Sequence, residues 1–325
     1  MIPLTVAVLL LVGGAAFAVF GPWLLRRAAP ALVRIPRIAI GLIVGGMLVW
    51  IGSVLAIGPV LAWAGSGPVV LSGQAADVCQ RCLAAANPFL GSTTSSLVPT
   101  ILFLVIPAVV ALSLGMATSA RMLRNARKAR VAAEAVRSGS VRTRLHGREV
   151  SVIDSETVLA LTFALRDGGI VLSTGAIRAL DHNELAAVLE HEHAHLRQRH
   201  HLISSLVDGI AAHLRWVPLV AAVAEAIPHY LEIAADNHAR QAVGTPALVG
   251  ALLKMAKPSP DTALASHPAA LHATGPERIR QLVRPGVGLS GAVPLIAIAA
   301  YLLALGIVSI AIQLPYASAA ITGCS

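Results

Sequence analysis

Four long apolar stretches, none with a charged side chain, constrain the fold of this chain more than any other feature. They cover residues 2–25, 38–63, 97–120 and 292–315. A helix of about 20 apolar residues crosses a bilayer core of roughly 30 Å. Charged residues make up only 13% of the chain, whereas soluble globular proteins contain about 25%. The sequence therefore predicts an α-helical membrane protein with four transmembrane helices.

The first apolar stretch could also be read as a cleaved signal peptide. In a signal peptide, positive charges precede a short apolar segment. Here Arg26 and Arg27 follow the apolar segment instead, so we expect a retained span.

The basic residues next to the spans predict an orientation. The 26–37 loop carries four arginines and no acid, and five basic residues lie within residues 121–130. Cytoplasmic loops carry an excess of Lys and Arg, so both segments belong in the cytoplasm. We expect residues 1–120 to hold three spans with an outer 64–96 loop. Residues 121–291 then form a cytoplasmic domain, residues 292–325 a fourth span with a short outer tail, and both termini lie outside.

The net charge of +9 raises the question of nucleic-acid binding. The arginines beside the spans are explained by membrane topology and by attraction to anionic lipid headgroups. Aromatic residues are only 4% of the chain, and no basic stripe alternates with them. We therefore expect contact with the lipid bilayer and no direct nucleic-acid binding.

The three cysteines, Cys79, Cys82 and Cys324, all fall on the outer side in this topology. Two of them could pair in an oxidising compartment. A C-x-x-C pair can also be redox-active or bind metal, and the sequence leaves these alternatives open.

The cytoplasmic segment contains all twelve histidines. Residues 149–154, 158–165 and 170–172 read as short strands. A helix follows, with Asp181 as its N-cap and Glu184 three residues later, as in a capping box. The segment therefore predicts an inserted domain of mixed α and β structure.

This helix carries HEHAH at residues 191–195, which satisfies the pattern HExxH. Residues four apart lie one above the other on a helix, so His191 and His195 can bind one zinc ion. Glu192 can then act as general base toward water. A chance match in a His-rich region is the alternative. Three nearby histidines, which we expect to be solvated or to support ligands, are His193, His200 and His201.

A catalytic zinc site needs a third protein ligand. Glu232 and Asp236 are four residues apart in an apolar, Ala-rich segment, where an unpaired carboxylate would be costly. We predict that Glu232 binds the metal and that Asp236 holds the far nitrogen of a ligand histidine. An exposed acidic helix face is the alternative.

HExxH followed by ExxxD resembles the membrane gluzincin metallopeptidases, namely the BlaR/MecR-type antibiotic-sensor transducers and, more distantly, the HtpX/Ste24 group. Three spans, a cytoplasmic zinc domain and a fourth span are the BlaR/MecR layout. Residues 170–173 resemble the substrate-binding edge strand of these enzymes, and residues 266–282 resemble a later element of their peptidase domain. The resemblance implies a zincin-like domain with one zinc ion per chain. We expect a donor from this later element to stabilise the oxyanion, with His267 as the first candidate; a turn residue before Pro268 is the alternative. Arg278 could instead hold the element in place by ion pairing.

One departure from that family concerns the sensor. BlaR/MecR-type sensors carry a penicillin-binding domain after the fourth span, and no Ser-x-x-Lys motif follows Pro315 here. Direct acylation by a β-lactam is therefore not expected.

The apolar segment 202–230 contains charged residues such as Asp208 and Arg215, which argue against a fifth span. Glu232 must also return to the metal. We predict two short helices that meet near Trp216 and Pro218 and lie against the membrane face.

These features predict an endopeptidase that cleaves proteins at the cytoplasmic membrane surface. A signalling protease acting on a transcription repressor of the BlaI/MecI type is the leading interpretation. The alternatives are an HtpX-like quality-control protease and, less favoured, a non-proteolytic receptor or scaffold. A homo-oligomer is compatible with all three.

Overall fold

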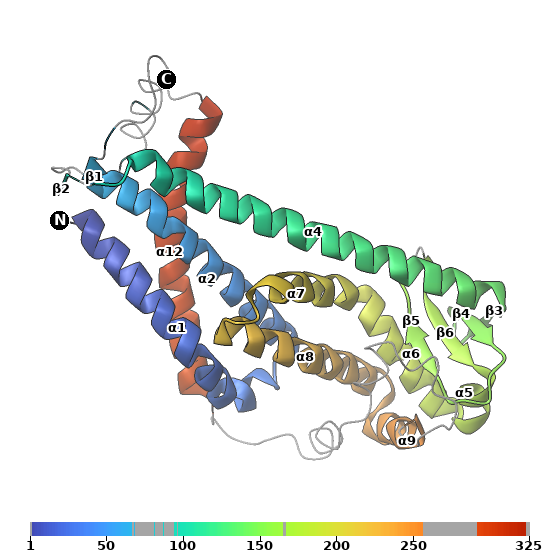
Figure 1. Ribbon diagram of the computed structural model, residues 1–325. Helices are drawn as coiled ribbons and strands as arrows, with labels where there is room; N and C mark the ends of the chain where they lie inside the picture. The colour runs from blue at the N-terminus through green and yellow to red at the C-terminus, as the bar shows by residue number, and fades with distance from the viewer. Residues whose placement is uncertain are drawn as a thin grey trace.

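The computed structural model describes residues 2–66, 97–164, 167–255 and 291–322, with residues 68, 81, 87, 94 and 95 between the first two ranges. Within these residues, four helices are long and apolar enough to cross a membrane (Figure 1). They are α1 (Ile2–Leu32), α2 (Pro36–Ala64), α4 (Thr100–Ser138) and α12 (Ala292–Thr322). The protein is a helical membrane protein with a domain containing a small sheet inserted between α4 and α12.

Helices α1, α2 and α12 pack closely. The indole nitrogen of Trp50 in α2 donates a 2.9 Å hydrogen bond to the carbonyl oxygen of Gly14 in α1. A Cβ at Gly46 would come within 2.7 Å of Leu302 Cδ1 in α12. Small residues at such positions let helix backbones approach each other in a bilayer, where packing drives association. A minor two-stranded pairing of β1 (Gly65–Ser66) with β2 (Thr94–Ser95) lies at the end of α2.

Helix α4 is peripheral and extends well beyond a bilayer. None of the residues in its most apolar window is buried. At about 1.5 Å per residue, its 39 residues span roughly 58 Å, about twice the hydrocarbon core. The helix therefore does not end near residue 120. The predicted domain boundary at residue 121 falls inside a continuous helix, whose far end reaches the sheet (Figure 1).

The domain contains a four-stranded sheet in the order β3–β4–β6–β5. Its strands are β3 (Ser140–Leu145), β4 (Arg148–Ile153), β5 (Ala160–Thr162) and β6 (Ile170–Ser173). Strands β4 and β6 run parallel, while β3 and β5 pair antiparallel with them. The prediction that residues 170–173 form an edge strand is wrong, because β6 pairs with a strand on each side. Strand β3 was not predicted.

Helices cover both faces of the sheet. On one face, apolar side chains of β4 and β6 share a core with α6 (His182–Arg197) and α9 (Thr245–Met255), and α5 (Thr174–Ala179) joins the same cluster. On the other face, Ala133 near the end of α4 packs with Leu161, Phe163 and Val171. The sheet thus holds α6 at a fixed position relative to α4.

The predicted capping box of α6 is confirmed. The Asp181 side chain accepts a 2.9 Å hydrogen bond from the Glu184 amide, and Glu184 accepts one of 2.8 Å from the Asp181 amide. Glu184 also pairs with Lys254 Nζ of α9 at 2.5 Å. These contacts satisfy amides at the start of the helix and fasten α9 to α6.

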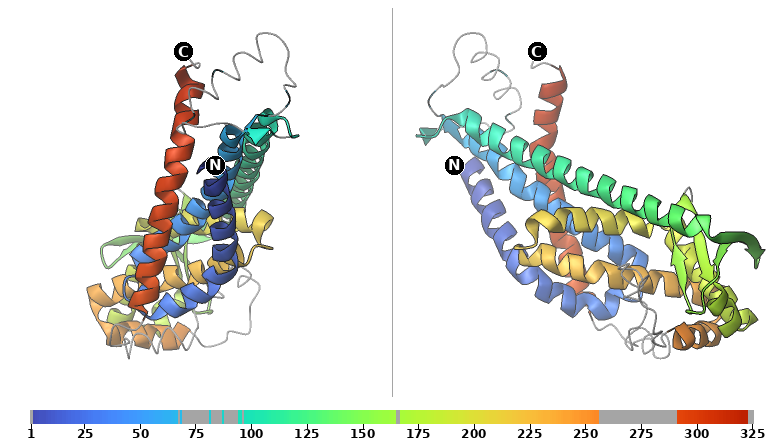
Figure 2. Two further views of the ribbon diagram at one scale, coloured as in Figure 1. Left: turned by 90° about the vertical axis from the view of Figure 1, so that its left-hand side faces the viewer. Right: turned by 45° about the vertical axis from the view of Figure 1, so that its right-hand side comes forward.

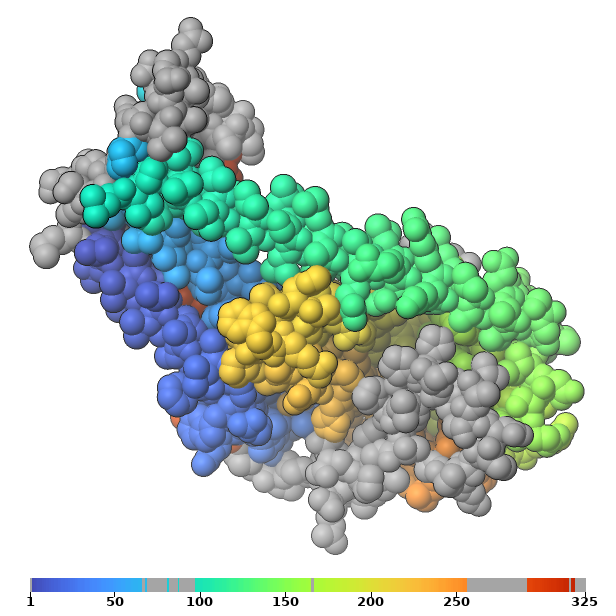
Figure 3. All heavy atoms as spheres, in the orientation of Figure 1, coloured from blue at the N-terminus to red at the C-terminus, as the bar shows by residue number. Residues whose placement is uncertain are grey.

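Helices α7 (His200–Leu214) and α8 (Pro218–Val243) form a hairpin that lies among the spans. Figure 2 shows both helices beside α1 and α2, and Figure 3 shows α7 between α4 and the α1–α2 pair. A Cβ at Gly21 of α1 would come within 2.9 Å of Leu219 Cδ1, and one at Gly209 of α7 within 2.7 Å of Thr118 Cγ2 in α4. Gly21 lies five residues before Arg26 in α1, which is about 7.5 Å along the helix axis.

The expectation that the hairpin lies against the membrane face stays a prediction; its apolar side chains share one core with α1, α2 and α12. The expectation that the second helix is short was wrong. It has 26 residues and continues through Pro228 to Val243, so one helix packs against the spans and carries Glu232 and Asp236 in its second half.

Candidate metal centre

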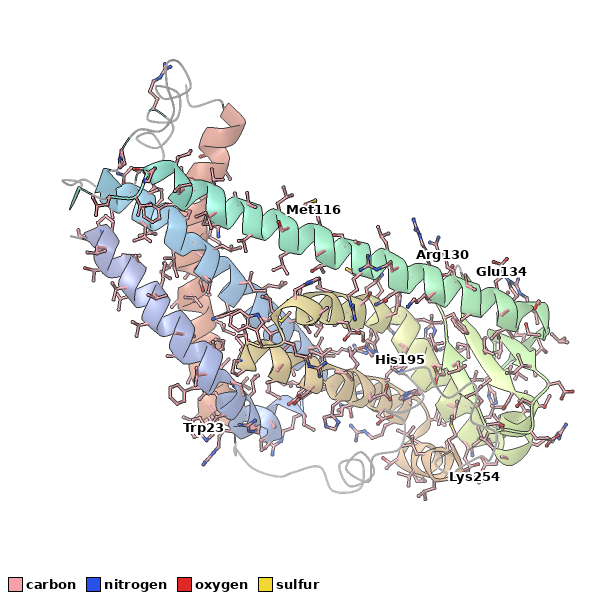
Figure 4. All side chains as sticks on the ribbon, viewed as in Figure 1. Trp23, Met116, Arg130, Glu134, His195 and Lys254 are labelled. Atoms are coloured by element: carbon pink, nitrogen blue, oxygen red, sulfur yellow. The ribbon has the colours of Figure 1, made fainter. Side chains whose placement is uncertain are left out.

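Three side chains from two helices converge on one point. The helix α6 contributes His191 and His195, one turn apart, and α8 contributes Glu232. The two imidazole Nε2 atoms are 3.1 Å apart, and each lies 3.5 Å from a Glu232 carboxylate oxygen. Ligands at about 2.0–2.1 Å in a tetrahedral arrangement would lie roughly 3.3 Å from one another. The spacing of the three groups therefore fits a single metal ion, and among the described residues they are the group of three that could hold one. Figure 4 labels His195 where α6 faces α8.

The electrostatics of this point favour a cation. Burial alone lowers the pKa of His191, but the adjacent carboxylates of Asp236 and Glu232 outweigh it and raise that pKa to about 10. The two carboxylates therefore favour a positive charge at this point. Two imidazoles and a carboxylate are a ligand set that suits zinc.

Asp236 lies directly behind His191. Its Oδ1 is 3.0 Å from His191 Nδ1, and only 3% of its side chain is exposed. A carboxylate on the far nitrogen fixes the imidazole with its Nε2 lone pair pointing at the site. Because the two residues come from α6 and α8, this contact also ties the helices together next to the centre.

Glu192 projects from the same helix toward the sheet. The Thr162 hydroxyl of β5 donates a hydrogen bond to Glu192 Oε2 and also lies 3.3 Å from the Glu192 carbonyl oxygen. Glu192 is 9% exposed, so its carboxylate is held rather than solvated. Sequence reasoning missed Thr162, since the alternation of a three-residue strand carries little information about which side chain meets a helix.

A neighbouring histidine lies against His195. His200 Nδ1 lies 2.8 Å from His195 Nδ1, and His200 is only 3% exposed. Burial and the adjacent His195 lower the pKa of His200 to about 3, so it is neutral. His193 and His201 are not part of the group formed by His191, His195 and Glu232. His201 is exposed. Burial together with the nearby Arg148 lowers the pKa of His193.

An ion pair missed by sequence reasoning flanks the centre. Arg148 of β4 donates through Nη2 to Glu190 Oε1 at 2.6 Å, and His238 Nε2 of α8 lies 3.3 Å from Glu190 Oε2. This arrangement joins β4, α6 and α8 one residue away from His191. No local pattern could reveal it, because the partners are more than 40 residues apart.

Other predicted residues lie outside the described part of the chain. These are His267 and Arg278, together with the cysteines Cys79, Cys82 and Cys324. The assignments made for them stay predictions.

Comparison with known proteins gives one match. The model of a protein family described as BlaR1 peptidase M56 matches residues 63–244, which is more than half of the chain. The matched range contains the HExxH helix, the sheet and Glu232. No curated protein and no solved structure matches.

Proposed function

We propose that this chain, which belongs to the BlaR1 peptidase M56 family, is a zinc endopeptidase whose active site is the centre formed by α6 and α8. Membership makes the protein a membrane metallopeptidase. The observation that supports the site is the convergence of His191, His195 and Glu232 beside a buried Glu192. In this assignment His191, His195 and Glu232 hold the metal, and one position remains for water or substrate.

A bound zinc ion supplies Lewis acidity, which activates water and polarises a peptide carbonyl. The chain's own residues supply the rest. Asp236 orients His191, and Glu192 takes the proton from the attacking water and passes it to the leaving amine. The hydrogen bond from Thr162 holds Glu192 Oε2, so Oε1 is the oxygen that takes the proton.

The edge strand β5 gives a substrate a place to bind. Among the residues that the structure describes it pairs with β6 alone, and its Thr162 contacts Glu192 of the active-site helix. An unpaired strand edge can bind an extended peptide through main-chain hydrogen bonds. A substrate bound along β5 would run past Glu192, which favours cleavage within a chain over trimming of its ends.

The substrate we favour is a cytoplasmic transcription repressor of the BlaI/MecI type. The arginine-rich segments next to the spans support a cytoplasmic site. The insertion of α7 and α8 among α1, α2 and α12 supports control of the site by the spans, which a signalling protease needs. An HtpX-like protease that removes damaged membrane proteins is the second candidate, supported by the packing of α8, which carries Glu232, against the spans.

A comparison of protein N-termini in cells tests this proposal. One strain carries the wild-type gene and the other Glu192→Gln, which keeps the shape of the side chain but removes its base. We expect new N-termini from a DNA-binding repressor in the wild-type strain alone. New N-termini from many membrane proteins would favour the quality-control role, and identical N-termini in both strains would contradict a peptidase.

A further inference from the structure

The turn between α6 and α7 has a specific geometry. Helix α6 ends at Arg197 and α7 begins at His200. Between them Arg199 adopts φ 52° and ψ 40°, the left-handed conformation. Residues other than glycine adopt this conformation only rarely. The turn brings His200 back against His195, which lies five residues earlier on the preceding helix.

His200 has a defined partner on each ring nitrogen. Its Nδ1 is 2.8 Å from His195 Nδ1, and its Nε2 is 3.3 Å from Gln198 Oε1. With 3% of its surface exposed, His200 has little contact with water. The ring is therefore held between a candidate metal ligand and a side-chain amide of the same turn.

The direction of these hydrogen bonds follows from metal binding, and this step rests on the proposed zinc site. His195 presents Nε2 to the metal, so its proton sits on Nδ1. That N–H must donate to His200 Nδ1, which is then unprotonated. The remaining proton of His200 lies on Nε2 and points at Gln198 Oε1, which is an acceptor. The ring N–H of His195 and that of His200 therefore each meet an acceptor, while the Gln198 Nε2 amide group is buried without a hydrogen-bond partner.

We infer that His200 is a positioning residue, which accepts the Nδ1 proton of His195 and so fixes the nitrogen that His195 presents to the metal. The two ligand histidines are supported differently: His191 by the charged Asp236 and His195 by a neutral imidazole. A zinc ion would balance the charges of Glu232 and Asp236, and Glu192 adds a further carboxylate beside it. A second supporting carboxylate at the place of His200 would add more negative charge and weaken the Lewis acidity of the ion.

The test compares two variants of nearly the same shape, His200→Asn and His200→Leu. The asparagine Oδ1 can accept the proton of His195, and leucine cannot. His201→Ala is the control, because His201 is an exposed neighbour. The dissociation constant for zinc is measured on the full-length protein in detergent by competition with a chelating dye. The absorption spectrum of the cobalt-loaded protein reports the ligand field directly.

Loss of the group that supports a ligand histidine weakens metal binding by about 10- to 100-fold. We expect that loss, with an altered cobalt spectrum, for His200→Leu. His200→Asn and His201→Ala should stay near wild type. Equal zinc affinities for the leucine and asparagine variants would overturn the role of His200 and leave the proposed zinc site standing. A wild-type chain that binds no zinc would overturn the proposed function as well.

Discussion

Leu219 of α8 lies against Gly21 of α1 so closely that a Cβ on Gly21 would come within 2.9 Å of Leu219 Cδ1. Thirteen residues later, the same helix carries Glu232, about 20 Å further along its axis. A movement of α1 against α8 would therefore displace one of the three groups that could hold the metal.

This contact predicts that Gly21→Leu impairs catalysis from a distance. The added side chain pushes α8 away from α1, and a shift of about 1 Å at a catalytic group can cost on the order of 100-fold in rate. We expect at least a roughly 10-fold loss in hydrolysis of labelled casein by the protein in detergent. Gly45→Leu is the matched control, since a Cβ there meets no atom within 4 Å. Equal rates for both variants would show that α1 does not act through α8.

Zinc content gives the second prediction. Metal analysis of the purified wild-type protein should find about one zinc per chain, because two histidines and one carboxylate complete a three-ligand catalytic site. The double variant His191→Ala/His195→Ala should contain almost none. Unchanged zinc in the double variant would mean that the metal is bound elsewhere.

The third prediction concerns Asp236, which supports His191. Asp236→Asn keeps the shape but removes the charge 3.0 Å from His191 Nδ1, so zinc affinity should fall by about 10- to 100-fold. Glu190→Gln is the control: it weakens the ion pair with Arg148 beside the centre and should lower thermal stability without changing zinc affinity. Asp236 would lose its assigned role if both variants bound zinc equally.

The fourth prediction separates catalysis from binding at Thr162. Thr162→Val removes the hydroxyl that donates to Glu192 and leaves the backbone of β5 intact. A hydrogen bond to a charged group contributes about 1.5–3 kcal/mol, so kcat should fall by roughly 10-fold or more while KM changes little. Thr162→Ser should restore the rate. A valine variant that changes only KM would indicate that Thr162 contacts substrate instead.

The parts of the fold that could be predicted from sequence depend on local interactions. Uncharged apolar length predicted the four spans, and the Asp181–Glu184 box predicted the start of α6, since each signal lies within a few adjacent residues. The HExxH spacing predicted that His191 and His195 lie together, because this signal also lies within a few adjacent residues. Glu232 and Asp236 could be placed near these two histidines only because a carboxylate in an apolar segment needs a partner.

The remaining features depend on long-range packing. An apolar segment interrupted by Asp208 and Arg215 gave no indication that α7 and α8 lie between the spans, because burial there is supplied by α1, α2 and α12. The second helix of the hairpin, which was expected to be short, continues through Pro228 to Val243. The place of β6 inside the sheet and the pairing of His200 with His195 likewise follow from tertiary contacts.

The hydrolysis rate of zinc-loaded Glu192→Gln tests whether Glu192 is the base of a zinc peptidase. The variant should retain one zinc per chain and the wild-type fold. Its rate with labelled casein should fall by at least about 100-fold, the usual contribution of a general base. Hydrolysis at the wild-type rate by a variant that holds its zinc would contradict the account.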